Sequence, residues 1–293
     1  MIYILENEKL KIKVSSMGAE LQSIYRAETD TEYLWQGDPD FWSGRACNIF
    51  PVCGRMIEGK YTYAGGTYDM PIHGFARNME WEVIHQKSNA LTLQLQSNAE
   101  TLAMFPWNFS LEMVYTLEED TLSVATILHN LDEKTMLFAI GGHPGFNVPL
   151  TDGEKFDDYY VEFDEVCEPR LLVLSDTCYY TGNTAPYPLE EGKRIPLHHR
   201  LFDNDALFFC NTAKGIALKS KTGERSVHMA FPDMKYIGLW HTRGADAPFV
   251  CIEPWTSVPG WDRPGIAAFE DKPEMSTLEP QTIYRNTYSL TFG

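Results

Sequence analysis

Short stretches of alternating apolar and polar residues run along most of this chain. Residues 10–14 (LKIKV), 91–96 (LTLQLQ), 122–128 (LSVATIL) and 159–163 (YYVEF) alternate with a period of two and are rich in β-branched and aromatic side chains. This spacing is typical of strands that bury one face. Similar segments follow at residues 216–218, 227–231, 236–240, 249–252 and 288–292. Helical periodicity is scarce, so the pattern predicts an all-β protein of many short antiparallel strands in meander order.

Turn residues separate the predicted strands at short intervals. Gly65-Gly66, residues 118–120 (EED), Asp152-Gly153 and Thr222-Gly223 lie between alternating runs. A sheet with one apolar face needs a second layer, which predicts a β-sandwich or barrel. No linker divides the chain, and we expect one domain over residues 1–293. Binding groups are expected on the long segments that interrupt the pattern, which are residues 30–55, 176–203 and 254–275.

Composition and charge narrow the function classes. Of the 293 residues, 44% are hydrophobic and 22% are charged, as in an ordinary globular protein. The formal net charge is −17, so nucleic acid and anionic membrane surfaces are not expected as partners. Residues 1–6 lack the basic start of a secretion signal, and the longest uncharged run, 135–151, is broken by glycine and proline. The six cysteines contain no CxxC pair and predict reduced thiols in a cytoplasmic protein.

Four segments break the alternation with polar residues set between glycine, proline and aromatic residues. They are CGR (53–55), IHGFAR (72–77), GGHPGF (141–146) and IEPW (252–255). His143 follows an apolar run, and Pro144 restricts its conformation, which would hold the imidazole in one direction. Gly74 would let a ligand or backbone approach His73 closely. For each histidine the alternative is a strand-end residue that only hydrogen-bonds a carbonyl.

Two carboxylates lie in similar surroundings. Glu253 ends the apolar run 249–252 and is followed by proline and tryptophan, so partial desolvation would make it a better base than a solvated glutamate. A salt bridge to a core-edge arginine such as Arg55 is the alternative, and the two interpretations are compatible. Asp205 lies in LFDNDAL (201–207) and is, on its own, more typical of a turn or cap.

Taken in order, these motifs resemble the aldose 1-epimerase (sugar mutarotase) family. The resemblance begins at GAELQS (18–23) and Trp35 in LWQG (34–37), and it continues through GR (54–55), HGFAR (73–77), GHPGF (142–146) and EPW (253–255). Each motif alone is modestly specific, but chance would not also preserve their order and separations. The segment around His73 lacks the longer asparagine-bearing glycine motif of galactose-type members, which bears on sugar preference more than on chemistry.

The resemblance implies a fold and a set of residue roles. The implied fold is a β-supersandwich of mostly antiparallel strands with one open sugar-binding face. The implied acid is His143 and the implied base is Glu253. The positions implied for substrate binding are His73, Arg55 and Asp205. Asp203 is two residues from Asp205 and would share its face on an extended strand, so it remains an alternative.

Anomer interconversion requires an acid and a base whatever the family. Opening a hemiacetal ring removes a proton from the anomeric hydroxyl while another reaches the ring oxygen. We predict that Glu253 takes the proton from O1 and His143 donates one to O5, with no cofactor or metal. The surplus of carboxylates is expected to favour the imidazolium form of His143. A ring such as Trp35 or Trp255 would lie against the C–H face of the sugar.

Three functions fit these residues. The first is an aldose 1-epimerase acting on a free aldohexose such as galactose or glucose. The second is a hexose-6-phosphate 1-epimerase, which would need an additional cationic pocket around a residue such as Arg77 or Arg45. The third is a non-catalytic carbohydrate-binding or sensor protein, which would not need both His143 and Glu253. The expected partner is a small-molecule sugar, and both a monomer and a homodimer remain open.

Overall fold

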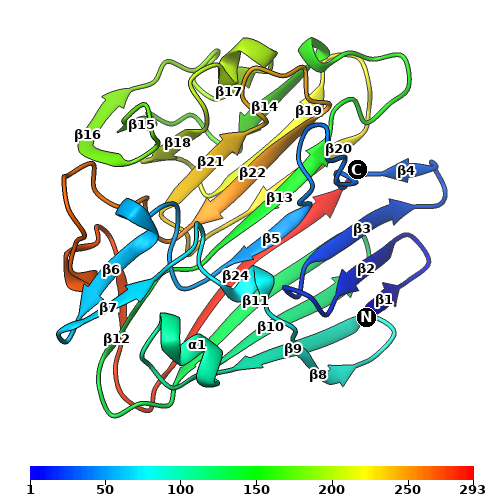
Figure 1. Cartoon of the computed structure of the whole chain (residues 1–293). Helices are drawn as coiled ribbons and strands as arrows, with labels where there is room; N and C mark the ends of the chain where they lie inside the picture. The colour runs from blue at the N-terminus through cyan, green and yellow to red at the C-terminus, as the bar shows by residue number, and fades with distance from the viewer.

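The computed structural model describes residues 1–293, and nearly all of its regular secondary structure is β-strand (Figure 1). This confirms the prediction of an all-β protein. No helix of the structure has both the length and the apolar character needed to cross a lipid bilayer. The helical segments are α1 (Ala99–Met104) and the 3₁₀ segments η1 (Ile57–Gly59), η2 (Ala76–Asn78), η3 (Phe156–Asp158), η4 (His199–Phe202) and η5 (Phe269–Asp271).

Nine strands form the larger sheet, and each runs antiparallel to its neighbours. In its strand β10 (Phe109–Glu118), Leu111, Met113 and Tyr115 are buried and the residues between them are partly exposed. This is the burial that a period of two predicts. The order is β17 (Arg194–Pro196), β14 (Tyr159–Phe163), β19 (Gly215–Ser220), β20 (Ser226–Ala230), β24 (Ile283–Phe292), β11 (Thr121–Asn130), β10, β9 (Ala90–Gln96) and β8 (Glu82–Gln86).

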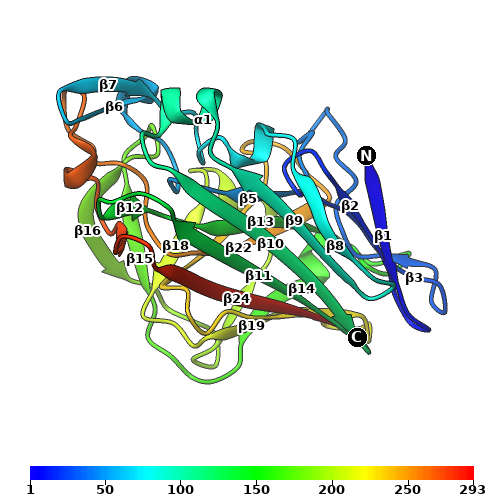
Figure 2. The ribbon, with the colours of Figure 1, turned by 90° about the horizontal axis from the view of Figure 1, so that it is seen from below.

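Seven strands form the second large sheet. Their order is β16 (Tyr180–Pro186), β15 (Arg170–Leu174), β18 (Leu207–Cys210), β21 (Tyr236–Trp240), β22 (Phe249–Trp255), β13 (Gly141–Asn147) and β5 (Ala46–Ile49). Figure 1 shows β21, β22, β13 and β5 side by side in this layer. Figure 2, seen from below, shows the long strands β9, β10, β11 and β24 of the other layer.

The two large sheets share one hydrophobic core, and β22 divides its residues between that core and the opposite face. Val250 and Ile252 belong to the same buried cluster as Leu111 of the larger sheet. Cys251 and Glu253 alternate with them and therefore point to the other face, although they too are buried. Loops cover part of this second face: Trp42 and His73, which lie outside the strands, both contact the ring of His143 on the neighbouring strand β13.

Smaller sheets flank this pair. They are a four-stranded sheet of β1 (Ile2–Glu6), β2 (Lys11–Ser15), β3 (Leu21–Arg26) and β4 (Thr31–Glu32), and the pairs β12 (Met136–Phe138) with β23 (Ser276–Leu278) and β6 (Lys60–Tyr63) with β7 (Gly66–Asp69). The expected meander order holds only locally, as from β8 to β11. It is wrong where β24 lies between β11 and β20, and where β13 lies between β22 and β5. Alternation identifies strands but does not identify their distant partners.

Candidate active site

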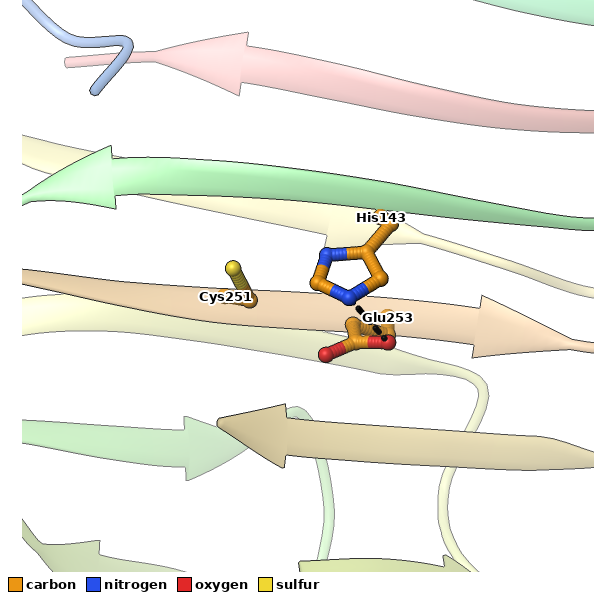
Figure 3. A group of neighbouring side chains, drawn as sticks. All are labelled: His143, Cys251 and Glu253. Carbon is orange, nitrogen blue, oxygen red and sulfur yellow. Dashed lines mark ion pairs between the residues drawn. The ribbon is translucent and has the colours of Figure 1, made fainter. Parts of the chain in front are cut away.

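Two adjacent strands of the seven-stranded sheet bring His143 and Glu253 together. In the antiparallel pair of β13 and β22, Gly141 is opposite Trp255, and the same register sets position 143 opposite position 253. Cross-strand partners point to the same face of a sheet. His143 Nε2 lies 3.4 Å from Glu253 Oε2, as Figure 3 shows. Two residues 110 positions apart in the chain therefore form one contact pair.

Glycines on either side of His143 make room for the rings that enclose it. Gly141 and Gly145 share the face of His143, because they are two residues away on the same strand. A Cβ at Gly141 would lie 2.7 Å from the Trp255 ring, and one at Gly145 would lie 3.2 Å from the Trp42 ring. The missing side chains let Trp42 stack on the imidazole, with 4.9 Å between ring centroids.

His73 reaches the same space from the loop before η2. Its backbone φ is 63°, in the left-handed region that residues with a side chain rarely adopt. Gly54 holds it there: the His73 N–H donates to the Gly54 carbonyl at 2.9 Å, and the Gly54 N–H donates to His73 Nδ1 at 3.3 Å. Because Nδ1 accepts a hydrogen bond, the proton of the neutral ring is on Nε2. His73 therefore offers a donor beside His143, 5.4 Å away between ring centroids.

These side chains line a cavity of about 280 Å³. Pockets for small molecules span about 300–1,000 Å³, so this one lies just below that range and suits a monosaccharide better than a longer glycan. Its polar lining includes Arg55, Arg77 and Asp205 beside the two histidines and Glu253. Its apolar walls are formed by aromatic and proline residues, including Trp42, Phe208, Trp240, Trp255 and Pro259.

Most of the predicted site residues meet at this cavity, which is lined by Glu253, His143, His73, Arg55, Asp205 and Trp255. Asp203 does not reach it. The chain turns after η4 and is not extended, so Asp203 lies at the surface, 3.8 Å from Arg200. Asp205 is the aspartate at the cavity: its Oδ1 accepts a hydrogen bond from the Ala206 N–H, and its Oδ2 accepts one from the Cys178 thiol at 3.1 Å.

Trp35 does not reach the cavity, which corrects its assignment as a sugar-facing ring. It is 6% exposed, stacks on Phe249 at 4.7 Å, and donates its indole N–H to the Trp42 carbonyl at 2.8 Å. Trp35 thus supports Trp42 from behind. Trp42, from the same loop, lines the cavity in its place, and the sequence does not distinguish these two tryptophans. Phe208 and Trp240 also line the cavity. The sequence alone does not mark them as site residues, because aromatic residues on strands are equally typical of a core.

Burial shifts the pKa values of both members of the pair toward their neutral forms. Burial, helped by the charge of Asp205, raises the pKa of Glu253 well above its usual range. Burial lowers the pKa of His143 to about 3, and the nearby charge of Arg77 acts in the same direction. The expectation of an imidazolium at His143 is therefore wrong. Surface carboxylates are screened within roughly 8–10 Å, whereas burial acts on the ring directly.

The pair can take one proton and give another. Neutral Glu253 with neutral His143 contains as many protons as carboxylate with imidazolium, and the two forms differ only by a proton moved across the contact. Burial makes the carboxylate a stronger base and the imidazolium a stronger acid. The arrangement therefore suits proton exchange with two oxygens of one bound molecule. Together with Cys251, the two residues are also of types that bind metal ions.

Comparison with known proteins gives a family match over nearly the whole chain. The family model of aldose 1-epimerase matches residues 1–288. The protein LacX (chromosomal) of Lactococcus lactis subsp. lactis is 33% identical over 305 residues, which cover 98% of either chain.

Two solved structures have the same fold over nearly their full length. A galactose mutarotase related enzyme from Lactobacillus acidophilus has a TM-score of 0.94 and 32% identity, and the match covers 100% of this chain and 97% of that one. A galactose mutarotase-like protein from Lactobacillus casei ATCC 334 has a TM-score of 0.94 and 30% identity, with both chains covered completely. The galactose mutarotase-like fold agrees with the expected β-supersandwich.

The pKa shift of His143 predicts that its ring stays neutral across the physiological range. Because burial moves the pKa from 6.5 to about 3, the ring should not gain a proton between about pH 8 and pH 5. Side-chain ¹⁵N NMR of the histidine rings, assigned with His143→Gln, measures this directly, with free imidazole as an internal reference. A titration of His143 with its midpoint near 6.5 would contradict the electrostatics described above.

Proposed function

Because the chain belongs to the aldose 1-epimerase family, we propose that residues 1–293 form one isomerase domain that interconverts the α and β anomers of an aldohexose. The observation that carries the proposal is the 3.4 Å contact between His143 Nε2 and Glu253 Oε2 in a cavity of monosaccharide size. An acid and a base beside one ligand are what ring opening requires. A protein that only binds sugar has no need for two buried, strongly shifted groups in contact.

The proposed ring opening moves one proton onto the enzyme and one onto the sugar. The reacting form is the carboxylate–imidazolium pair, which arises from the neutral pair when a proton moves from Glu253 to His143. The Glu253 carboxylate then takes the O1 proton while the His143 imidazolium donates to O5, the C1–O5 bond breaks, and C1=O1 forms. The pair is left as neutral glutamic acid and neutral imidazole, which are the forms that burial favours. Rotation about C1–C2 then presents the other face of the aldehyde, and the reverse transfers close the ring.

The remaining polar groups of the cavity hold the hydroxyls in this account. His73 offers its Nε2–H, Arg55 offers guanidinium donors, and Asp205 offers acceptors. The C–H face of the sugar lies against an aromatic wall, for which Trp42 and Phe208 are the candidates together with Trp255. Galactose is the first sugar to test, because two solved relatives are described as related to galactose mutarotase.

A second candidate substrate is a hexose 6-phosphate. Two arginines that line the cavity without forming an ion pair favour it. The chain has 41 acidic and only 24 basic residues, yet Arg55 and Arg77 form no ion pair and both line the cavity. Two free guanidinium groups suit an anionic ligand. Arg45 is not available for this role, because its side chain bonds Gln22 and the Gln36 carbonyl outside the cavity.

We place the enzyme in the cytoplasm. All six cysteines are free, including the partly exposed Cys167, Cys178 and Cys210. Free thiols of this kind persist in a reducing compartment. The substrate class proposed above, a small sugar or sugar phosphate, is compatible with that location.

Removal of either member of the pair is expected to abolish catalysis without abolishing binding. Glu253→Gln and His143→Gln each remove one proton transfer, so kcat should fall by about 100- to 10,000-fold. Polarimetry of freshly dissolved α-galactose and α-glucose measures the rate, and calorimetry measures sugar binding. Glu274→Gln and His228→Gln make the same chemical changes outside the cavity and should keep full activity. Wild-type protein that binds sugar and leaves the spontaneous rate unchanged would refute the proposal.

The second candidate predicts a selectivity that depends on the two arginines. Hexose 6-phosphate should be turned over with a higher kcat/KM than the free hexose, so the ratio of the two kcat/KM values should exceed one. Arg77→Met should lower this ratio by about 10- to 100-fold, because it removes one charged hydrogen bond to the phosphate. Arg200→Met, 90% exposed and outside the cavity, is the control and should leave the ratio unchanged. A ratio below one in the wild type would leave the free aldohexose as the substrate.

A further inference from the structure

A third side chain of metal-binding type lies beside the acid–base pair. Cys251 is two residues before Glu253 on β22 and therefore shares its face. The ligating atoms of His143, Cys251 and Glu253 all lie within 4.8 Å of one another. Figure 3 shows the Cys251 sulfur on one side of the imidazole and the Glu253 carboxylate near its Nε2. The proposed sugar chemistry uses His143 and Glu253 but gives Cys251 no part.

Two polar atoms of this cluster have no hydrogen-bond partner. His143 Nδ1 and Glu253 Oε2 are both buried and unpaired, and the residues are only 8% and 1% exposed. Buried polar atoms are almost always satisfied, and an unsatisfied one destabilises the folded chain. Cys251, which is fully buried, makes no side-chain hydrogen bond either. Glu253 Oε2 and the Cys251 sulfur thus lack a hydrogen-bond partner, while the imidazole presents Nε2 to Oε2 at 3.4 Å and leaves its other nitrogen, Nδ1, unpaired.

We propose that His143, Cys251 and Glu253 form a binding site for a single thiophilic divalent cation of the zinc type, with its fourth position open to the cavity. A thiolate and a carboxylate balance the double charge of the ion, and the neutral imidazole adds none, so the occupied site is neutral in its buried position. Nitrogen, oxygen and sulfur together favour zinc and its soft neighbours over magnesium or calcium.

The three ligand atoms need to move only slightly closer to one another to bind a zinc ion. Zinc holds nitrogen and oxygen at about 2.0–2.2 Å and sulfur at about 2.3 Å, which sets tetrahedral ligands roughly 3.3–3.7 Å apart. The ligand atoms now lie within 4.8 Å of one another, and their separations fall into this range if the Cys251 sulfur and the Glu253 oxygen each move by about 1 Å. Binding converts the Cys251 thiol to thiolate and releases its proton to solvent, so affinity rises with pH.

An ion at this position would exclude the proton exchange proposed above. It would engage His143 and Glu253 and occupy the floor of the cavity, so metal and sugar should compete. The metal site does not rest on the identity of the sugar or on turnover, because binding of the ion is measured without substrate.

Titration of the wild-type protein with Co²⁺ tests the site. A thiolate-to-cobalt charge-transfer band should appear with one ion per chain, and excess Zn²⁺ should remove it. In Cys251→Ser the band should vanish and the affinity should fall at least about tenfold. Cys178→Ser is the matched control, because Cys178 lines the same cavity beside Asp205 and should keep the band.

A measurement on the unmodified chain covers the case in which Cys251→Ser does not fold. X-ray absorption of the zinc-loaded wild type should show one sulfur at about 2.3 Å together with nitrogen or oxygen ligands. Cobalt bound without a thiolate band, a band lost in Cys178→Ser but kept in folded Cys251→Ser, or a zinc shell without sulfur would each overturn the proposal.

Discussion

The antiparallel register of β13 and β22 sets His143 opposite Glu253, and the cavity forms around that pair. A shift of this register by one residue would point the site residues of one strand toward the core instead of the cavity. Val250 and Ile252 oppose such a slip, because they bury the other face of β22 against the larger sheet. The absence of a side chain at Gly145 then lets Trp42 stack on the ring. The same strands therefore pack one face into the core of the sandwich and line the site with the other.

Burial gives the site its acid and base strength and also destabilises the folded chain. Glu253 is 1% exposed, and its Oε2 lacks a hydrogen-bond partner. The same withdrawal from water makes the carboxylate a stronger base and the His143 imidazolium a stronger acid. A stability-optimised sheet would place apolar residues there, and local departures from good packing rules are expected at functional sites. The unused lone pairs of the site provide the basis for the proposed metal binding.

Much of the fold and of the candidate site could be predicted from the pattern of residues, and the features that could not be predicted have physical causes. Alternation identified the strands because burial of one face leaves a period of two, but it carried no information on which distant strands pair. His143 and Glu253 could be found because glycine and proline interrupt strands where a site needs close approach. Trp42 could not be told from Trp35, since the loop path decides which ring faces the ligand. The charge state of His143 depends on burial, which net charge does not report.

The most direct test is the crystal structure of the Glu253→Gln protein with a bound aldohexose. The variant keeps the shape of the side chain and stops the proton transfer, so the sugar should be trapped. The account predicts O1 within hydrogen-bond distance of residue 253 and O5 within hydrogen-bond distance of His143 Nε2. A sugar bound in the cavity with its anomeric carbon directed away from both side chains would contradict it.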